Sequence, residues 1–296
     1  MITAFCNDKG IRWEENLPLS ECTTFRIGGT ADIAVFPQNT KQMADLIRFL
    51  HQNSLRYFVL GRGSDILADD EGYRGVLVLT REMNDLRREE NRIFAGAGCS
   101  MTSVSNLARK EGLAGLEFLH GIPGSIGGGV FMNAGAYGFE ISTYIESVEW
   151  VSPDGEIHRT PGSALEFSYR HSYFTDHTGI VCSAVFSCVP GDPAEIGAII
   201  SDLDSRRREK QPLEYPSAVS FFKRPVGHFA GKLIEDAGLK GYSVGDACVS
   251  EKHAGFIINK GNATAKDVKD LMEYVTKTVL DQSGVLLEPE VRFLEQ

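Results

Sequence analysis

A glycine-rich run in the middle of the chain is the residue pattern best suited to contact a ligand. It reads GIPGSIGGG over residues 121–129 and MNAGAYG over residues 132–138. Such a density of glycine is entropically costly unless the backbone must lie against something bulky and polar, such as a diphosphate or a flat ring system. A flexible surface loop is the alternative, but the interleaved apolar residues argue against a fully solvated segment. The residues expected to contact a ligand are Gly121, Pro123, Gly124, Ser125, Gly127, Gly128, Asn133, Ala134 and Gly135.

A shorter glycine pattern, GRGS at residues 61–64, follows an apolar run that predicts a strand. Small residues there let backbone N–H groups approach phosphate oxygens, and the serine hydroxyl adds a donor. A plain tight turn is the more common reason for this pattern, and the third glycine of the GxGxxG dinucleotide fingerprint is missing. The candidate cofactor contacts in this loop are Gly61, Arg62, Gly63, Ser64 and Asp65.

Helix and strand signals alternate through the first 205 residues. The spacing of apolar residues over 43–50 predicts an amphipathic helix, and a second helix is expected around 104–108. Asp192 followed by Pro193 predicts the N-cap and first residue of a helix that ends before Pro212. Strands are predicted at residues 57–60, 76–79, 93–95, 145–151 and 180–185, with a turn at 153–155.

The C-terminal third has its own set of signals. A helical stretch ends at Gly238, a strand covers 256–258, and a helix covers 268–279. The tail over 285–294 has the character of a strand, and Pro289 within it indicates an edge or a bulge.

The composition indicates an ordinary folded protein. Its 296 residues are 42% hydrophobic, and 40 acidic residues against 30 basic ones give a formal net charge of −10. This balance disfavours a broad surface for nucleic acid or an anionic membrane, while a local anion pocket remains compatible with it. No apolar run approaches the ~20 residues of a membrane span, and the N-terminal residues do not resemble a secretory signal.

The six cysteines contain no CxxC pair, and no HExxH or other metal-ligand spacing occurs. Scattered cysteines in a chain of this size indicate reduced thiols rather than a disulfide framework. We therefore expect a cytoplasmic protein without a bound metal.

Several segments occur in an order that resembles one family. They are TTFRIGG (23–29), the 61–64 loop, GIPGSIGGGVFMNAGAYG (121–138), SYRHS (168–172), SFFKRP (220–225), AGKLIEDAGLKG (230–241), SEKHAGFIIN (250–259) and LEPEVRF (287–293). Each piece alone is unspecific, whereas the ordered set covers nearly the whole chain. The set is similar to the UDP-N-acetylenolpyruvoylglucosamine reductases, flavoproteins of peptidoglycan precursor synthesis, in the branch that lacks an extra tyrosine loop.

This resemblance implies an α+β chain, with a two-subdomain FAD-binding region of the vanillyl-alcohol-oxidase type and a C-terminal α+β substrate domain. The expected boundaries are 1–80 for the first subdomain, which the tail 285–296 can join, 81–205 for the second, and 206–284 for the substrate domain. The resemblance also implies FAD as cofactor, NADPH as co-substrate and the enolpyruvyl ether of UDP-N-acetylglucosamine as acceptor. We expect no nucleic-acid or membrane partner, and a monomer is favoured over an oligomer.

By the same resemblance, Arg170, Ser220 and Glu290 occupy the catalytic positions. Hydride addition to the enolpyruvyl double bond leaves negative charge shared with the substrate carboxylate, and a guanidinium can bind that carboxylate through two bonds. A serine hydroxyl held within about 3 Å can then protonate the carbon. A glutamate there must be protonated or paired with a cation, and as a neutral acid it can donate a hydrogen bond. Without the resemblance, a structural salt bridge, an ordinary loop hydroxyl and a surface glutamate would remain open.

Candidate substrate contacts come from the same C-terminal region. Lys223 and Arg224 can meet the UDP diphosphate, while the arginines at 206–208 are more typical of a solvated helix end. His253 can contact substrate or satisfy hydrogen bonds in the core, and the residue type does not separate the two.

Two positions depart from the family pattern. Val219 stands before the serine where the family usually has glycine, and Asp65 stands where it often has asparagine. A β-branched residue would be strained if position 219 requires a positive φ. Two other functions stay open from the sequence: another FAD-dependent oxidase or dehydrogenase of the same fold, and a flavin- or UDP-sugar-binding protein without turnover.

Overall fold

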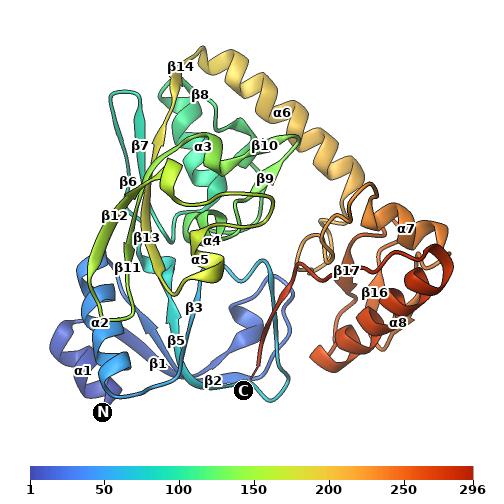
Figure 1. Ribbon diagram of the computed structural model, residues 1–296, viewed down its shortest axis with the longest axis horizontal. Coiled ribbons are helices and arrows are strands. Elements are labelled where there is room, and N and C mark those ends of the chain that lie inside the picture. The colour runs from blue at the N-terminus through green and yellow to red at the C-terminus, as the bar shows by residue number, and fades with distance from the viewer. Residues whose placement is uncertain (296) are drawn as a thin grey trace. The chain divides into compact units, whose positions relative to one another are not determined.

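The structure, a computed structural model, describes residues 1–295 and divides the chain into two compact units (Figure 1). Unit 1 comprises Met1–Glu15, Ile33–Arg62 and Gly75–Ser205. Unit 2 comprises Asn16–Asp32, Gly63–Arg74 and the chain from Arg206 onward. Each unit is therefore assembled from segments that are distant in the sequence, so residues far apart along the chain can share one site.

Unit 1 holds most of the regular structure. Its helices are α1 (Ile2–Lys9), α2 (Thr40–Gln52), α3 (Met101–Lys110), α4 (Ile126–Phe131), α5 (Tyr173–Asp176) and most of α6 (Pro193–Lys210), with short 3-10 turns η2 (Thr80–Glu82), η3 (Glu117–Leu119), η4 (Ile141–Thr143) and η5 (Gly162–Ala164). Its strands are β3 (Tyr57–Leu60), β6 (Leu86–Glu89), β7 (Arg92–Gly96), β8 (Leu113–Ala114), β9 (Gly135–Ala136), β10 (Phe139–Glu140), β11 (Ile145–Val151), β12 (Ile157–Pro161), β13 (Ile180–Ser187) and β14 (Val189–Pro190). The boundary between the units falls inside β1 (Arg12–Pro18), β2 (Thr30–Phe36) and β5 (Tyr73–Leu79).

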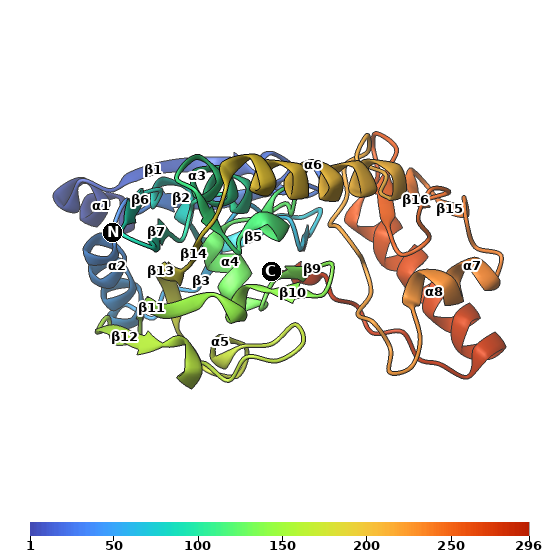
Figure 2. The ribbon, with the colours of Figure 1, turned by 90° about the horizontal axis from the view of Figure 1, so that it is seen from above.

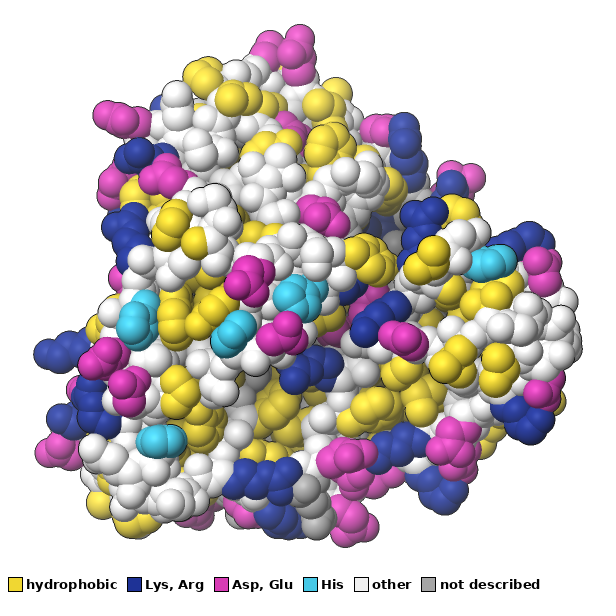
Figure 3. All heavy atoms as spheres, in the orientation of Figure 1, with side chains coloured by type: hydrophobic (Ala, Val, Ile, Leu, Met, Phe, Trp, Pro, Cys, Tyr) yellow, Lys and Arg dark blue, Asp and Glu magenta, His cyan; other side chains and the backbone are white. Residues whose placement is uncertain are grey.

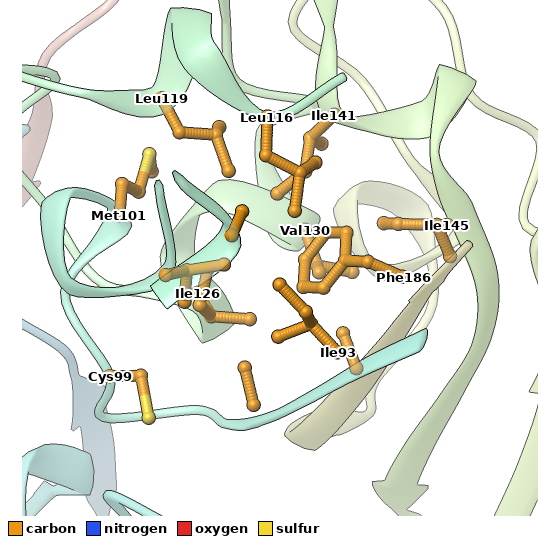
Figure 4. Close-up of a cluster of buried hydrophobic side chains, with 14 of the residues drawn as sticks. Ile93, Cys99, Met101, Leu116, Leu119, Ile126, Val130, Ile141, Ile145 and Phe186 are labelled. Carbon is orange, nitrogen blue, oxygen red and sulfur yellow. The ribbon is translucent and has the colours of Figure 1, made fainter. Parts of the chain in front are cut away.

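A five-stranded antiparallel sheet of order β12-β11-β13-β7-β6 forms the main framework of unit 1. Helix α4 packs against β13 and β7, and its Ile126 and Val130 are fully buried. Figure 4 shows these two side chains among Ile93 of β7, Phe186 of β13 and Leu116 in one hydrophobic cluster. The sheet and this cluster hold the glycine-rich run in place.

The second sheet has the order β1-β2-β5-β3, with β3 parallel to β5 from Tyr57↔Val76 to Leu60↔Leu79. Helix α2 begins after Asn39, whose side chain accepts a hydrogen bond from the backbone N–H of Gln42 at 3.0 Å. The apolar face of α2 is buried, as the spacing over 43–50 predicts. β3 ends at Leu60, the one buried residue of this strand, so the GRGS loop leaves the sheet directly after a buried side chain.

Unit 2 contains η1 (Leu19–Glu21), β4 (Ile66–Ala68), α7 (Ala230–Asp236), β15 (Ser243–Val244), β16 (Ala247–Val249), β17 (Ile257–Asn259), α8 (Ala265–Ser283) and β18 (Arg292–Leu294). Helix α8 begins with a capping box between Thr264 and Asp267 and ends at Gly284, whose φ is 71°. Asp70 accepts hydrogen bonds from the N–H groups of Ala265 (2.8 Å) and Lys266 (3.0 Å), which ties the 63–74 segment to this helix.

Short strands complete the framework of unit 2. β15, β16 and β17 form an antiparallel sheet, and β18 runs parallel to β4. The hydrophobic core joins the apolar face of α8 to residues near the expected active site: Phe25, Phe221, Phe222, Leu287 and Val291. Distant segments therefore share one core in this unit.

Most predicted elements are confirmed, and two regions differ from expectation. Asp192 caps α6 by accepting a hydrogen bond from the N–H of Ala194 at 2.7 Å, and Figure 2 shows the helix as one continuous rod. The glycine-rich run is not wholly irregular, because α4 forms inside it. The strand expected over 285–294 is shorter, since only Arg292–Leu294 pair as β18. Pro289 makes a separate bridge, consistent with a break in the strand.

The distribution of surface charge and the state of the cysteines both match what the composition predicts. On the face drawn in Figure 3, basic and acidic side chains are interspersed. The six cysteines are free and buried, which confirms the prediction of reduced thiols. Burial raises the pKa of the thiols of Cys6, Cys99 and Cys188 to about 11, because a thiolate would lose its solvation. Across residues 1–295, no helix is both long and apolar enough to span a membrane.

Candidate functional site

The N-terminal end of α4 is fastened to the loop that follows β7. The N–H groups of Ile126 and Gly127 donate to the carbonyls of Cys99 and Ala97, each at 2.9 Å. Ser125, the residue before the helix, pairs with Ser100 through an isolated β-bridge. These bonds hold a glycine-rich backbone in a defined conformation, which is what close contact with a ligand requires.

Two buried hydroxyls beside this backbone lack a hydrogen-bond partner among residues 1–295. They are Ser125 Oγ and Thr80 Oγ1. A Cβ atom placed on Gly61 would come within 2.2 Å of Ser125 Oγ and 4.0 Å of Thr80 Oγ1, so the predicted loop lies against both. An unsatisfied buried polar group costs about 1–3 kcal/mol, and a polar ligand atom would remove that cost.

The residues present fit a cofactor that carries a diphosphate. Gly61, Ser125 and Thr80 offer small groups and hydroxyl donors in one place within unit 1. Gly128 adds open space, because a Cβ there would meet only Ser125 Oγ, at 3.8 Å. Sequence reasoning missed Thr80, for which the available signal was its position directly after the predicted strand 76–79.

We expect Gly128→Ala to weaken flavin binding without destabilising the apoprotein. The helix gains up to about 1 kcal/mol from alanine. The added methyl enters open space in the protein but would overlap a bound cofactor, a cost of about 1–3 kcal/mol, or roughly 5- to 150-fold in Kd. Flavin titration and urea unfolding of the apoprotein measure the two effects separately. An unchanged flavin Kd would show that the cofactor does not occupy this space.

Arg170 lies in unit 1, in a two-residue turn between Ser168 and His171. Ser168 and His171 exchange both backbone hydrogen bonds, each at 3.1 Å. Arg170 has φ 53°, a left-handed conformation that is uncommon for a residue other than glycine. Its guanidinium carbon lies 5.1 Å from the centre of the Tyr169 ring. The backbone therefore presents the arginine at the tip of a tightly closed turn.

Ser220 and Glu290 are brought together in unit 2 by a short antiparallel pairing. Phe222 bridges Pro289, the N–H of Glu290 donates to the carbonyl of Phe221 at 2.9 Å, and the N–H of Lys223 donates to the carbonyl of Glu288 at 2.9 Å. Both side chains are half-buried. Ser220 Oγ donates to the carbonyl of Phe222 at 3.4 Å, a long and weak bond that leaves the hydroxyl available for another partner.

Val219, directly before Ser220, has φ 58°. The condition under which a β-branched residue is strained is therefore met, and Val219 stands in the left-handed region where glycine is favoured. Its side chain packs against a small cluster of Cys248, Phe256 and Ile258. This packing partly offsets the backbone strain beside the candidate proton donor.

Comparing two variants at position 219 measures the free-energy cost of a side chain in the left-handed backbone conformation. Val219→Gly and Val219→Ala both lose the branched methyl groups, but only alanine keeps a Cβ in the left-handed region. We expect the glycine variant to be more stable by about 1 kcal/mol, the reverse of the order at an ordinary position. Urea unfolding of the two variants side by side measures this difference. Equal stability, or a more stable alanine variant, would contradict the strain.

The candidate substrate residues all lie in unit 2. Lys223 Nζ is 3.6 Å from a carboxylate oxygen of Glu288, and the guanidinium carbon of Arg224 is 4.0 Å from the ring centre of Phe229. Phe229 is 60% exposed, so this arginine and ring form a surface that a ligand can reach. The two cations lie three and four residues after Ser220 in the sequence.

His253 has a defined tautomer. Its Nδ1 accepts a hydrogen bond from the N–H of Gly255 at 3.1 Å, so in the neutral ring Nε2 carries the proton. Burial lowers the pKa of His253, because the charged imidazolium would lose solvation. One nitrogen thus satisfies a local hydrogen bond, and the other can donate to a ligand oxygen.

The second half of the GRGS loop is braced within unit 2 by the TTFRIGG segment. The N–H of Thr24 donates to the carbonyl of Gly63 at 3.1 Å, and a Cβ on Gly63 would come within 2.2 Å of the carbonyl oxygen of Cys22. The carbonyl of Asp65 accepts from the N–H of Arg292 at 3.0 Å. The loop, the N-terminal motif and the C-terminal strand therefore form one supported backbone arrangement.

Known proteins share these features over nearly the whole chain. Residues 211–294 match the family described as UDP-N-acetylenolpyruvoylglucosamine reductase, C-terminal domain, and residues 31–161 match an FAD binding domain. The UDP-N-acetylenolpyruvoylglucosamine reductase of Clostridium botulinum (strain Eklund 17B / Type B) is 48% identical over 97% of this chain and 94% of its own length. The chain belongs to the UDP-N-acetylenolpyruvoylglucosamine reductase family.

Further relatives agree with this assignment. The UDP-N-acetylenolpyruvoylglucosamine reductase of Clostridium novyi (strain NT) is 48% identical over 95% of this chain and 92% of its own length. The crystal structure of UDP-N-acetylenolpyruvylglucosamine reductase from Thermus caldophilus superposes with a TM-score of 0.81, at 33% identity, over 96% of this chain and 100% of that one.

Membership of the UDP-N-acetylenolpyruvoylglucosamine reductase family confirms the expected fold class and cofactors. The chain combines an FAD-binding region with a C-terminal α+β domain, and it is an FAD-dependent oxidoreductase that uses NADPH. It carries out the reduction step in peptidoglycan precursor synthesis. The two alternatives, an oxidase of the same fold and a binding protein without turnover, are therefore set aside.

Proposed function

We propose that this chain reduces the enolpyruvyl ether of UDP-N-acetylglucosamine to UDP-N-acetylmuramate, with Arg170, Ser220 and Glu290 acting on the enolpyruvyl group. The observation that supports the roles of Ser220 and Glu290 is the Phe222–Pro289 bridge, which pairs the two backbone segments that carry them. A serine hydroxyl held close to the reacting carbon can deliver a proton to it. The relatives named above support the substrate.

FAD fits at Gly61, Thr80, Ser125 and Gly128, and when bound it supplies the two-electron carrier that links NADPH oxidation to substrate reduction. The protein holds the cofactor through backbone and hydroxyl donors in this place. Those groups bind phosphate oxygens well because they present N–H and O–H donors without bulky side chains.

Arg170 binds the substrate carboxylate in this proposal. Its planar guanidinium can form two parallel hydrogen bonds to a carboxylate. Negative charge develops on the enolpyruvyl group and its carboxylate during reduction, so a fixed cation stabilises the transition state more than the ground state. The closed turn from Ser168 to His171 restricts where that cation lies.

Ser220 donates the proton that completes the reduction. Its weak 3.4 Å bond to the Phe222 carbonyl allows the hydroxyl to turn toward substrate at little cost. Glu290, half-buried on the paired segment, donates a hydrogen bond to the developing charge as a neutral acid. Lys223 and Arg224 bind the diphosphate, and the Nε2–H of His253 donates to the same substrate.

The proposed setting is the cytoplasm, since six free, buried cysteines are typical of a reducing compartment. We also propose that the protein acts as a monomer, which light scattering of the purified flavoprotein tests.

Anaerobic spectroscopy tests the reaction. NADPH should bleach the flavin absorbance, and addition of the enolpyruvyl UDP-sugar should restore it with one equivalent of UDP-N-acetylmuramate formed. Restoration by oxygen alone, with no effect of the enolpyruvyl sugar, would contradict the proposed acceptor.

A further inference from the structure

We infer that Asn133 is a positioning residue for Arg170, holding the arginine turn against the end of the glycine-rich segment. The inference rests on the proposed role of Arg170. The sequence pattern alone placed Asn133 among the cofactor contacts, but its side chain is fully buried and points its bonds into the protein.

Both the nitrogen and the oxygen of the Asn133 side-chain amide form hydrogen bonds with neighbouring segments. Nδ2 donates to the carbonyl of Ser168 at 2.9 Å and to Oε2 of Glu140 at 2.8 Å. Oδ1 accepts from the N–H of Ser142 at 3.2 Å. An amide has two N–H donors, and both are engaged here, so the side chain has no donor left for a ligand.

The bond to Ser168 reaches the base of the turn that carries Arg170. The Ser168 carbonyl also accepts the N–H of His171 at 3.1 Å, the bond that closes the turn. A second anchor lies on the other side, where Ser172 Oγ donates to the carbonyl of Phe131 at 2.8 Å. Phe131, the last residue of α4, and Asn133 therefore bind the turn on its two sides.

Backbone conformation supports a dedicated role. Asn133 has φ 45° and Arg170 has φ 53°, so two non-glycine residues joined through this network both occupy the left-handed region. Such conformations cost about 1–3 kcal/mol each and persist only where surrounding bonds determine them. Asparagine tolerates this region better than most residues, and it also supplies the amide. The hydrogen bonds of Asn133 thus hold both residues in this strained conformation, and the result is a fixed position for the turn that carries the Arg170 guanidinium.

Matched variants test the bond to Ser168. Glu140→Gln alone keeps it, because Nδ2 can still donate to the oxygen of the introduced glutamine and to Ser168. Adding Asn133→Asp in that background keeps the bond from the Ser142 N–H, and lets the introduced amide at position 140 donate to the new carboxylate. The donor to Ser168 is replaced by a carboxylate oxygen, which faces the Ser168 carbonyl as a second acceptor. The double variant against the single one therefore measures the loss of that bond together with this repulsion. Asn133→Gly, which removes the amide without adding an acceptor, serves as a second variant.

We expect the double variant to reduce the enolpyruvyl substrate at least about tenfold more slowly than Glu140→Gln, with a change mainly in kcat. Flavin content and the rate of flavin reduction by NADPH should change less than about threefold. Hydrogen exchange of the apoprotein supplies a readout independent of activity: the His171 amide should lose protection. Loss of flavin, or equal slowing of both half-reactions, would instead make Asn133 a cofactor contact and overturn the inference.

Arg170→Lys, measured in parallel, separates this inference from the proposed function. If Arg170→Lys leaves the enolpyruvyl step unchanged, the proposed role of the arginine fails. If Arg170→Lys slows that step while the Asn133 variants do not, and His171 stays protected, only the positioning role fails.

Discussion

Ser220→Ala should slow reduction of the enolpyruvyl substrate by about 10² or more, the size of effect expected when a general acid is removed. The flavin should still be reduced by NADPH at close to the normal rate, because that half-reaction needs no proton from this hydroxyl. The half-buried serine, with its single long hydrogen bond, contributes little to folding, so the variant should fold normally. Stopped-flow measurement of the two half-reactions distinguishes these effects.

Ser217→Ala is a suitable control for this experiment. Ser217 lies three residues earlier in the same segment, and its backbone carbonyl, not its side chain, accepts the bond from Thr24 Oγ1 at 2.7 Å. This variant should retain both half-reactions. Equal slowing of both half-reactions in Ser220→Ala would assign the serine to flavin binding rather than proton donation.

Arg170→Lys should lower the rate of the enolpyruvyl step by about 10² to 10³, in line with removal of one transition-state donor. Lysine keeps the charge but offers a single point contact in place of a planar fork, so the loss reports on two-bond recognition of the carboxylate. Flavin reduction by NADPH should be much less affected. Steady-state kinetics with varied substrate, combined with stopped-flow reduction by NADPH, measure both quantities.

Arg159→Lys supplies a matched control in the same unit. Arg159 bonds to Ser147 Oγ at 3.3 Å across neighbouring strands, away from the Ser168–His171 turn in the sequence. It should have full activity. An Arg170→Lys enzyme that is as active as this control would remove Arg170 from the reaction.

Local patterns in the sequence predicted those elements whose signals are periodic or flanked by clear start and stop residues. The strands at 57–60 and 145–151 occur with the predicted bounds. The first is an apolar run that ends at the GRGS loop, and the second ends just before the predicted turn at 153–155. The Asp192–Pro193 pair predicted the start of α6 for a physical reason, since the carboxylate caps the first turn.

Elements that depend on distant contacts were not predictable in the same way. Helix α4 forms from the sequence IGGGVF, although glycine is a poor helix former. Burial of Ile126 and Val130, and the bonds from its first N–H groups to the 97–99 segment, compensate for this low propensity. The Phe222–Pro289 bridge likewise has no local signal, because it joins two segments that meet only in the folded unit.

The residues of the candidate site also separate into those with a local sequence signal and those without one. Glycine-rich runs could be read as ligand contacts from composition, whereas Arg170, Ser220 and Glu290 came from resemblance to a family. Thr80 emerged only from its unsatisfied buried hydroxyl, and the bonds of Asn133 only from coordinates. Side-chain pairing between distant segments is the information that a single sequence does not carry.

The central claim is that a guanidinium, a hydroxyl and a carboxyl group act on one enolpyruvyl group. A crystal structure of the FAD-loaded protein with the enolpyruvyl UDP-sugar tests it most directly. We predict that Arg170, Ser220 and Glu290 each place a polar atom within about 3 Å of the enolpyruvyl moiety. A bound substrate whose enolpyruvyl group contacts none of them, or only one, would contradict the account.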